Sequence, residues 1–338
     1  PFGLGIGAAG LVAMPDGSEL AVLVQNLFTS TSSLWRFDCV ANQWLDEDPA
    51  TPGVQPLSAA TRPGLGWDIR TIHVESDPAA ANTAILEDLE GGVNSIALHV
   101  GGPGLPAAKD ALSRALDGVM LDVCPIVLIA GDETFAAASA LNAVWDERGV
   151  ALGDRRGAFG DDPLGTLAMQ GHLGEPLETA LAHAVSLVKL AAGMPNVTAL
   201  CADGVPYHVA GGSEAQELAA MLSTLVAYLK ACEKGGIAPQ DALPKISVAL
   251  AADDDQFSTI AKLRAARKLI WRVAEACGAG DAARRVQIAT PTSYRMMAKR
   301  DPWTNILRTT IACASAALGG ADAICVLPFT FALGKPDR

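Results

Sequence analysis

The chain lacks an excess of basic charge, closely spaced cysteines and a basic leader segment. Its 338 residues carry 25 Lys and Arg against 37 Asp and Glu, which gives a formal net charge of −12 at pH 7. Such a surface repels polyanions, so we expect no nucleic acid partner. The seven cysteines are odd in number and show no metal-ligand spacing, which indicates small buried side chains in a reducing compartment rather than a disulfide or zinc framework.

The first residues also lack the pattern of a targeting segment. The stretch PFGLGIGAAGLVAMPDG is apolar, but glycine and proline interrupt it and no basic residues lead it. We therefore expect neither a signal peptide nor a membrane span, and we expect a cytoplasmic protein without a membrane partner. The chain begins with Pro1 instead of Met, and it ends abruptly, which suggests a fragment of a longer protein.

Apolar residues make up 50% of the chain and charged residues 18%, enough for a large core. From residue 67 onward, short runs rich in Val, Ile and Leu alternate with helical patterns, as in parallel strands joined by crossover helices. Eight such repeats over this length predict an α/β fold of the (β/α)8 (TIM) barrel type. The predicted strands are Trp67–Glu75, Val93–Gly101, Cys124–Gly131, Gly157–Pro163, Asn196–Val205, Lys245–Ala252, Arg285–Pro291 and Asp322–Phe329.

Two helices carry clear start and stop signals. Ser213 and Gln216 have the spacing of a capping box, and an apolar face at helical spacing follows them. Asp301 and Pro302 predict the N-cap and first position of a later helix, which Gly319 and Gly320 should end.

Residues 1–66 lack this alternation and are rich in glycine, serine and proline. We expect an extended N-terminal arm or linker here, with the barrel domain over residues 67–338. The stretch GIGAAG at 5–10 fits the G-x-G-x-x-G dinucleotide fingerprint, but no strand has room to precede it. A flexible glycine-rich terminus is the better interpretation.

Of five histidines, His208 stands out by location, because it follows the fifth predicted strand on the face where barrel enzymes build active sites. Asp203 and residues 253–255 should lie near the same rim. A lone histidine without an identified carboxylate partner is weak evidence of catalysis, and a buried structural histidine explains it as well.

Several long motifs together resemble the barrel domain of the methylmalonyl-CoA mutase family, adenosylcobalamin-dependent isomerases of propionate metabolism. They are PYHVAGGSEAQELA, PKIS, FSTIAKLRAARKLIWRVAEACG and TSYRMMAKRDPWTNILRTTIACASAALGGADAI. The resemblance covers roughly residues 57–338 and implies a barrel through which the coenzyme A arm threads. It also implies that a separate C-terminal domain with an Asp-x-His-x-x-Gly motif supplies cobalamin. That motif is absent here, so we expect no cobalamin-binding domain in this chain.

The resemblance implies roles for four residues. His208 stands where catalytic members hydrogen-bond the substrate thioester carbonyl, and Tyr207 is its usual neighbour. Lys245 and Ser247 occupy the family's Arg-x-Ser sequence, which contacts coenzyme A. Lysine keeps the charge of arginine but loses its bidentate fork, so phosphate recognition should be weaker.

Other family motifs are missing. Catalytic members read Gly-Gly-Thr-Gln-Ser-Leu-His-Thr-Asn at the last strand, where this chain reads GGADAICVLPF, and the Arg-Gly-Tyr-Asp-Ser-Asp segment is absent from residues 1–160. These losses resemble the small subunit of heterodimeric bacterial members. They imply a degenerate chain that supports a large catalytic subunit, with adenosylcobalamin in the complex and doubtful acyl-CoA binding.

Two other functions remain open at this point. The chain could be an active acyl-CoA mutase barrel in its own right. It could also be an unrelated barrel lyase that uses Lys245 as a Schiff-base amine, although barrel chemistry sits at the opposite strand ends.

Overall fold

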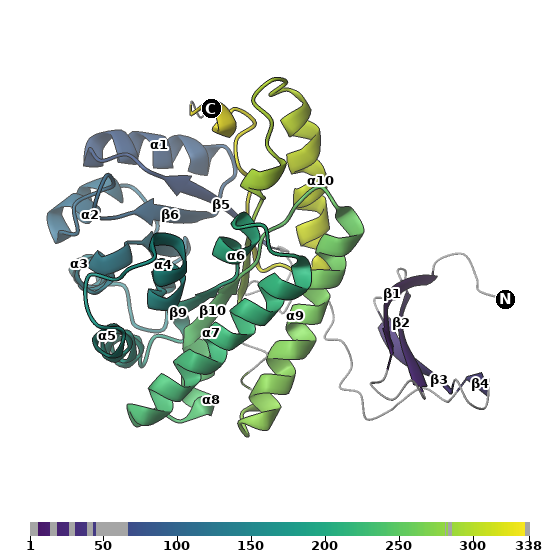
Figure 1. Ribbon diagram of the computed structural model, residues 1–338. Helices are drawn as coiled ribbons and strands as arrows, with labels where there is room; N and C mark the ends of the chain where they lie inside the picture. Colours follow the sequence, from purple (N-terminus) through teal and green to yellow (C-terminus); the bar gives the residue numbers. More distant parts are fainter. Residues whose placement is uncertain are drawn as a thin grey trace.

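Eight parallel strands close into a barrel (Figure 1). The structure, a computed structural model, describes residues 67–280, 282 and 286–334 with their side chains, and four N-terminal strands by their backbone. Each predicted strand run overlaps one barrel strand, so the (β/α)8 prediction is confirmed. The strands are β5 (Asp68–His73), β6 (Ser95–His99), β7 (Ile126–Ile129), β8 (Arg156–Asp161), β9 (Asn196–Asp203), β10 (Ile246–Ala249), β11 (Ile288–Pro291) and β12 (Ala323–Cys325).

Helices follow most strands and cover the outside of the barrel (Figure 1). The α-helices are α1 (Pro78–Glu90), α2 (Lys109–Ala115), α3 (Thr134–Glu147), α4 (Pro163–Gln170), α5 (Leu177–Leu190), α6 (Val205–Val209), α7 (Glu214–Lys234), α8 (Pro239–Ala242), α9 (Gln256–Ala276) and α10 (Thr304–Gly319). Short 3-10 helices are η1 (Gly131–Glu133), η2 (Leu243–Lys245), η4 (Tyr294–Met296) and η5 (Phe331–Leu333). None of the described helices combines the length and the apolar character needed to cross a membrane.

The main core lies between the outer face of the barrel and its helices. Ile96 and Leu98 on β6 are fully buried, as are Leu112 on α2 and Leu141 on α3. Branched apolar side chains of this kind suit a strand whose outer face is covered, and burying each contributes roughly 1.5–3 kcal/mol. The barrel wall is therefore rigid enough to fix the residues at its two rims.

The two predicted helix starts differ in outcome. At α7 the capping box is present, since the Ser213 hydroxyl accepts the Gln216 N–H and the Gln216 side chain accepts the Ser213 N–H. The predicted start of α10 at Asp301 and Pro302 was wrong, because the helix begins at Thr304. The Asp301 carboxylate accepts the Thr304 hydroxyl and caps no backbone N–H. The predicted end is confirmed, with Gly320 at φ 91°.

Four N-terminal strands form a separate antiparallel sheet in the order β1-β2-β3-β4. They are β1 (Ile6–Ala13), β2 (Glu19–Asn26), β3 (Thr31–Asp38) and β4 (Gln43–Trp44), and the analysis of the sequence predicted none of them. The described residues of GIGAAG lie in β1, which pairs with β2 and opens no helix, so the context of a dinucleotide fingerprint is missing. The boundary between an arm at 1–66 and the barrel domain stays a prediction.

Candidate functional site

The barrel is hollow. A cavity of about 670 Å³ is lined by residues from both ends of the strands. Most barrels of this type fill their interior with layers of bulky branched side chains. Here many of the lining positions are small, which leaves the interior open: Gly157, Ala158, Gly160, Ser247, Ala249, Ala289 and Ala323.

The C-terminal mouth of the cavity is acidic. Asp203 ends β9, Asp162 follows β8, and Asp132 and Glu133 come from η1. Burial, together with the neighbouring Asp162, raises the pKa of Asp203 to about 7. Burial also raises the pKa of Asp162 to about 6. Asp162 accepts the Tyr228 hydroxyl and the Gly165 N–H, the latter at 2.9 Å.

Nearer the N-terminal ends of the strands, the lining carries a cation and an unpaired hydroxyl. Arg70 on β5 lines the cavity, and its Nε donates to the Ser95 hydroxyl at 2.9 Å. Burial lowers the pKa of Arg70, and Asp68 acts in the opposite direction. Thr198 on β9 is 3% exposed, and its hydroxyl has no hydrogen-bond partner. Asp68, two residues before Arg70 on the same strand, also lines the cavity, so this part of the lining carries both signs of charge.

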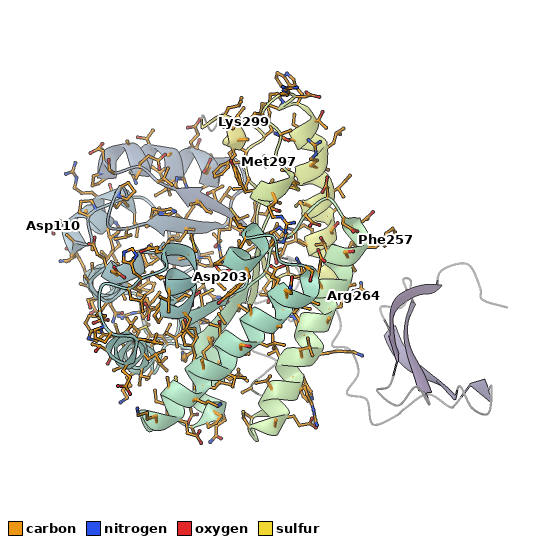
Figure 2. The ribbon with its side chains drawn as sticks, in the orientation of Figure 1. Asp110, Asp203, Phe257, Arg264, Met297 and Lys299 are labelled. Atoms are coloured by element: carbon orange, nitrogen blue, oxygen red, sulfur yellow. The ribbon has the colours of Figure 1, made fainter. Side chains whose placement is uncertain are left out.

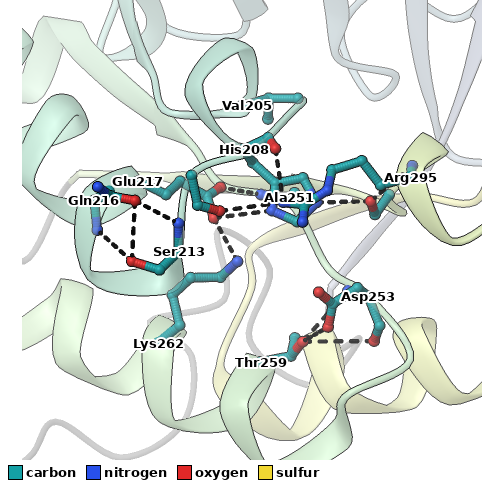
Figure 3. Close-up of polar contacts among 12 residues, drawn as sticks. Val205, His208, Ser213, Gln216, Glu217, Ala251, Asp253, Thr259, Lys262 and Arg295 are labelled. Atoms are coloured by element: carbon teal, nitrogen blue, oxygen red, sulfur yellow. Dashed lines mark hydrogen bonds and ion pairs between the residues drawn. The ribbon is translucent and has the colours of Figure 1, made fainter. Parts of the chain in front are cut away.

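The side chain of His208 lies outside this cavity, in a buried polar cluster (Figure 3). Its Nε2 pairs with the Ser293 hydroxyl at 2.7 Å, and its Nδ1 lies 3.6 Å from the Glu217 carboxylate. Burial lowers the pKa of His208, while Glu217 acts in the opposite direction. His208 is 1% exposed, so its ring serves the packing between α6, α7 and the segment after β11.

Glu217 is the centre of the cluster. Its carboxylate accepts the Lys262 ammonium at 2.5 Å and the Ala251 N–H at 2.7 Å. Both charged side chains are buried, and Figure 3 shows Lys262 and His208 converging on the same carboxylate. Arg295 adds a further link, because its guanidinium donates to the backbone carbonyl of His208 at 2.8 Å. The cluster thereby joins the segments that follow β9, β10 and β11.

The structure does not bring the four predicted site residues together in one site. Tyr207 lies beside His208 on α6, and neither lines the cavity. Lys245 lies at the opposite end of the barrel, where its ammonium donates to the carbonyls of Met194 and Val197. Only Ser247 lines the cavity, and its hydroxyl donates to the Leu200 carbonyl at 3.1 Å. The roles of these four residues stay predictions.

The rim prediction agrees with the structure, since Asp203 ends β9 and residues 253–255 follow the C-terminal end of β10. Arg70 and the ion pair of Glu217 with Lys262 were not predicted from the sequence. The sequence does contain a signal for this pair. Glu217 lies four residues before Met221 on the buried face of α7, and Lys262 lies four residues before Ala266 on the buried face of α9. A charge at an apolar position indicates a buried partner.

The described residues show no cluster of metal ligands. Among them no group of three or more His, Cys, Asp or Glu side chains could hold a metal ion. His208 near the C-terminal rim is turned toward Ser293 and Glu217.

Comparison with known proteins identifies the relatives of the chain. A family model described as methylmalonyl-CoA mutase matches residues 99–338. The methylmalonyl-CoA mutase small subunit of Streptomyces virginiae is 46% identical over 296 residues, which is 86% of this chain and 47% of that protein. The corresponding small subunit of Propionibacterium freudenreichii subsp. shermanii is 36% identical over 290 residues, 85% of this chain and 44% of that protein.

A more distant relative is the methylmalonyl-CoA mutase of Escherichia coli (strain K12), 26% identical over 275 residues, 80% of this chain and 35% of that protein. The chain spans about half the length of the small subunits that it matches.

Proposed function

Because the chain belongs to the methylmalonyl-CoA mutase family, we propose that it is the barrel of a small subunit that supports a large catalytic subunit without rearranging substrate itself. Such a complex interconverts methylmalonyl-CoA and succinyl-CoA. The similarity to small subunits from two genera, at 46% and 36% identity, favours this assignment over a catalytic chain.

The position of His208 carries the proposal. A histidine that hydrogen-bonds a thioester carbonyl must reach into the substrate cavity. His208 instead pairs with Ser293 and lies outside the cavity lining. We infer that this histidine does not contact substrate and that its buried ring stabilises the packing of the rim.

The charge of the cavity supports the same conclusion. The lining includes five acidic residues, Asp68, Asp132, Glu133, Asp162 and Asp203, against two arginines, Arg70 and Arg156. Coenzyme A esters are polyanions, and a net negative channel repels them. The ammonium of Lys245, the candidate phosphate contact implied by the family, donates hydrogen bonds to two backbone carbonyls. Acyl-CoA recognition by this barrel is therefore weak or lost.

The two alternatives have less support. An active mutase barrel needs a donor for the thioester carbonyl inside the cavity, at the position that His208 would have to reach. A lyase that uses Lys245 as a Schiff-base amine needs an ammonium near the C-terminal rim, whereas Lys245 precedes β10. In the complex, adenosylcobalamin would be held by the large subunit.

Turnover of the isolated chain tests the proposal. The chain, supplied with adenosylcobalamin and methylmalonyl-CoA, should form no succinyl-CoA, while a mixture with the large subunit should be active. In the active mixture, His208→Asn should leave turnover nearly unchanged. A loss of about a hundredfold with the complex intact would give His208 a role on substrate and overturn the proposal.

A further inference from the structure

The outer face of α10 differs from that of the other long helices. The other described helices of more than ten residues, α1, α3, α5, α7 and α9, each expose at least one Lys, Arg, Asp or Glu. The exposed positions of α10 and of the residue directly before it carry no charge. They are termed the α10 face and comprise Trp303, Ile306, Leu307, Thr310, Ile311, Ala314 and Leu318.

Large apolar side chains form one stripe on the α10 face. Leu307, Ile311 and Leu318 are separated by four and seven residues, which places them on the same side of a helix. Trp303 lies one turn before them and stacks on Phe329, with the ring centroids 5.1 Å apart, yet it is 68% exposed. Leu307 is 64% exposed. Since the core packs against the opposite side of α10, this second apolar stripe is typical of a surface that binds another protein.

The neighbouring helix α9 extends this surface. The guanidinium of Arg264 donates to the Leu318 carbonyl at 2.9 Å, so this side of α9 borders α10. Phe257 lies seven residues before Arg264, hence on the same side of α9, and is 81% exposed (Figure 2). Arg308, the single charged residue of α10, is turned toward α9, where its guanidinium lies 3.7 Å from the Asp254 carboxylate.

Unpaired cations lie at the edges of the α10 face. Lys268 is one turn beyond Arg264 on α9, and Lys299 and Arg300 are exposed just before Trp303. None of these four basic side chains forms an ion pair within the part of the chain that the structure describes. The rim is therefore basic on a chain with a net charge of −12. A symmetric contact with a second copy would bring this rim against itself, whereas an unlike partner can supply acidic groups.

The α10 face has the size of an interface centre. A helix of 16 residues is about 24 Å long. A stable interface buries roughly 800 Å² on each partner and involves about 20–30 residues a side, more than this face offers alone. Interface centres are depleted of charge and enriched in aromatic side chains, and a polar rim surrounds them. The α10 face and its basic rim match that arrangement.

We propose that the α10 face docks on the large catalytic subunit, with its apolar stripe in a groove that acidic side chains surround. This inference rests on the proposed function, which supplies an unlike partner chain. It adds to that function the surface of contact and the charge of the partner's surface.

Biolayer interferometry of the full chain against an immobilised, affinity-tagged large subunit tests the inference. Leu307→Asp and Ile311→Asp each place a carboxylate in the apolar stripe and should weaken binding about thirtyfold or more. Lys299→Glu should weaken binding at low salt and less at high salt, because the attraction at the rim is screened. Each variant replaces an exposed side chain, so the melting temperature of the free chain should stay close to that of the parent.

Phe135→Asp is the matched control. Phe135 is 50% exposed on α3, which follows β7, four strands away from the β11 strand that precedes α10. This change should alter the affinity by about twofold or less.

The possible results separate the inference from the proposed function. If Leu307→Asp and Ile311→Asp bind as tightly as the parent, or if Phe135→Asp binds as weakly as they do, the inference is wrong and the proposed function stands. A parent chain that does not bind the large subunit would overturn both. Light scattering of the isolated chain adds one further check, since a dimer that Leu307→Asp converts to a monomer would assign the face to a second copy and overturn the inference.

Discussion

Removing Lys262 should destabilise the barrel more than any surface change, because Glu217 would keep a buried charge without its counter-ion. Both side chains are completely buried, and the ammonium lies 2.5 Å from the carboxylate. Breaking a buried pair by removing one partner typically costs about 3–5 kcal/mol. We therefore expect Lys262→Met to lower the free energy of unfolding by about that amount.

Replacing both partners should recover most of the loss. In the double variant Glu217→Gln with Lys262→Met no buried charge remains, and the new side-chain amide can still accept the Ala251 N–H that Glu217 accepts at 2.7 Å. Buried pairs replaced by uncharged side chains of similar volume are often neutral in stability. We expect the double variant to lie within about 1–2 kcal/mol of the parent chain, with strong coupling between the two sites.

Urea unfolding followed by far-ultraviolet circular dichroism and by tryptophan fluorescence provides the measurement, with coincident transitions as the check on two-state behaviour. Lys268→Met is the matched control, because this lysine lies on the same helix and is partly exposed. The reasoning fails if Lys262→Met costs no more than Lys268→Met, or if the double variant is less stable than both single variants.

Three further predictions concern the rim, a helix start and the barrel wall. Since the native pKa of Asp203 is raised to about 7, the folded state binds more protons than the unfolded state between about pH 4 and 7. The free energy of unfolding should thus fall as pH rises through this range, and Asp203→Asn should reduce this dependence on pH. An unchanged pH dependence in Asp203→Asn would contradict the assignment. Ser213→Ala removes the cap of α7 and should cost about 0.5–2 kcal/mol in urea unfolding, and no measurable loss would mean that the cap contributes little. Gly157→Ala should lower the melting temperature strongly, because the new Cβ would lie 1.8 Å from the Ile126 carbonyl oxygen and the backbone has a φ of +137°. Gly153→Ala is the control, since its Cβ would meet open space and the melting temperature should change little. Equal melting temperatures of the two variants would contradict this reasoning.

The barrel could be predicted because its strands and helices carry local patterns. Apolar runs such as Val93–Gly101 and capping residues such as Ser213 depend on near neighbours in sequence, and each predicted run overlaps a strand. The start of α10 was missed because Asp301 bonds to the Thr304 side chain instead of a backbone N–H, a choice that sequence spacing does not reveal.

The site was less accessible to sequence reasoning. The ring of His208 contacts Glu217 and Ser293, which lie 9 and 85 residues away in sequence. Only the fold brings these partners together, so the sequence did not identify them. The open interior depends on small side chains from many strands at once, and Arg70 belongs to a strand with no family motif. The resemblance to the mutase family is confirmed by the match over residues 99–338.

Complex formation with a large subunit tests the central claim most directly. The chain would be co-expressed with a cognate large mutase subunit that carries an affinity tag, and the captured material would be analysed by size-exclusion chromatography with light scattering. The account predicts one stable species with the two chains in equal amounts. A large subunit that elutes alone, with this chain absent from the captured material, would contradict it.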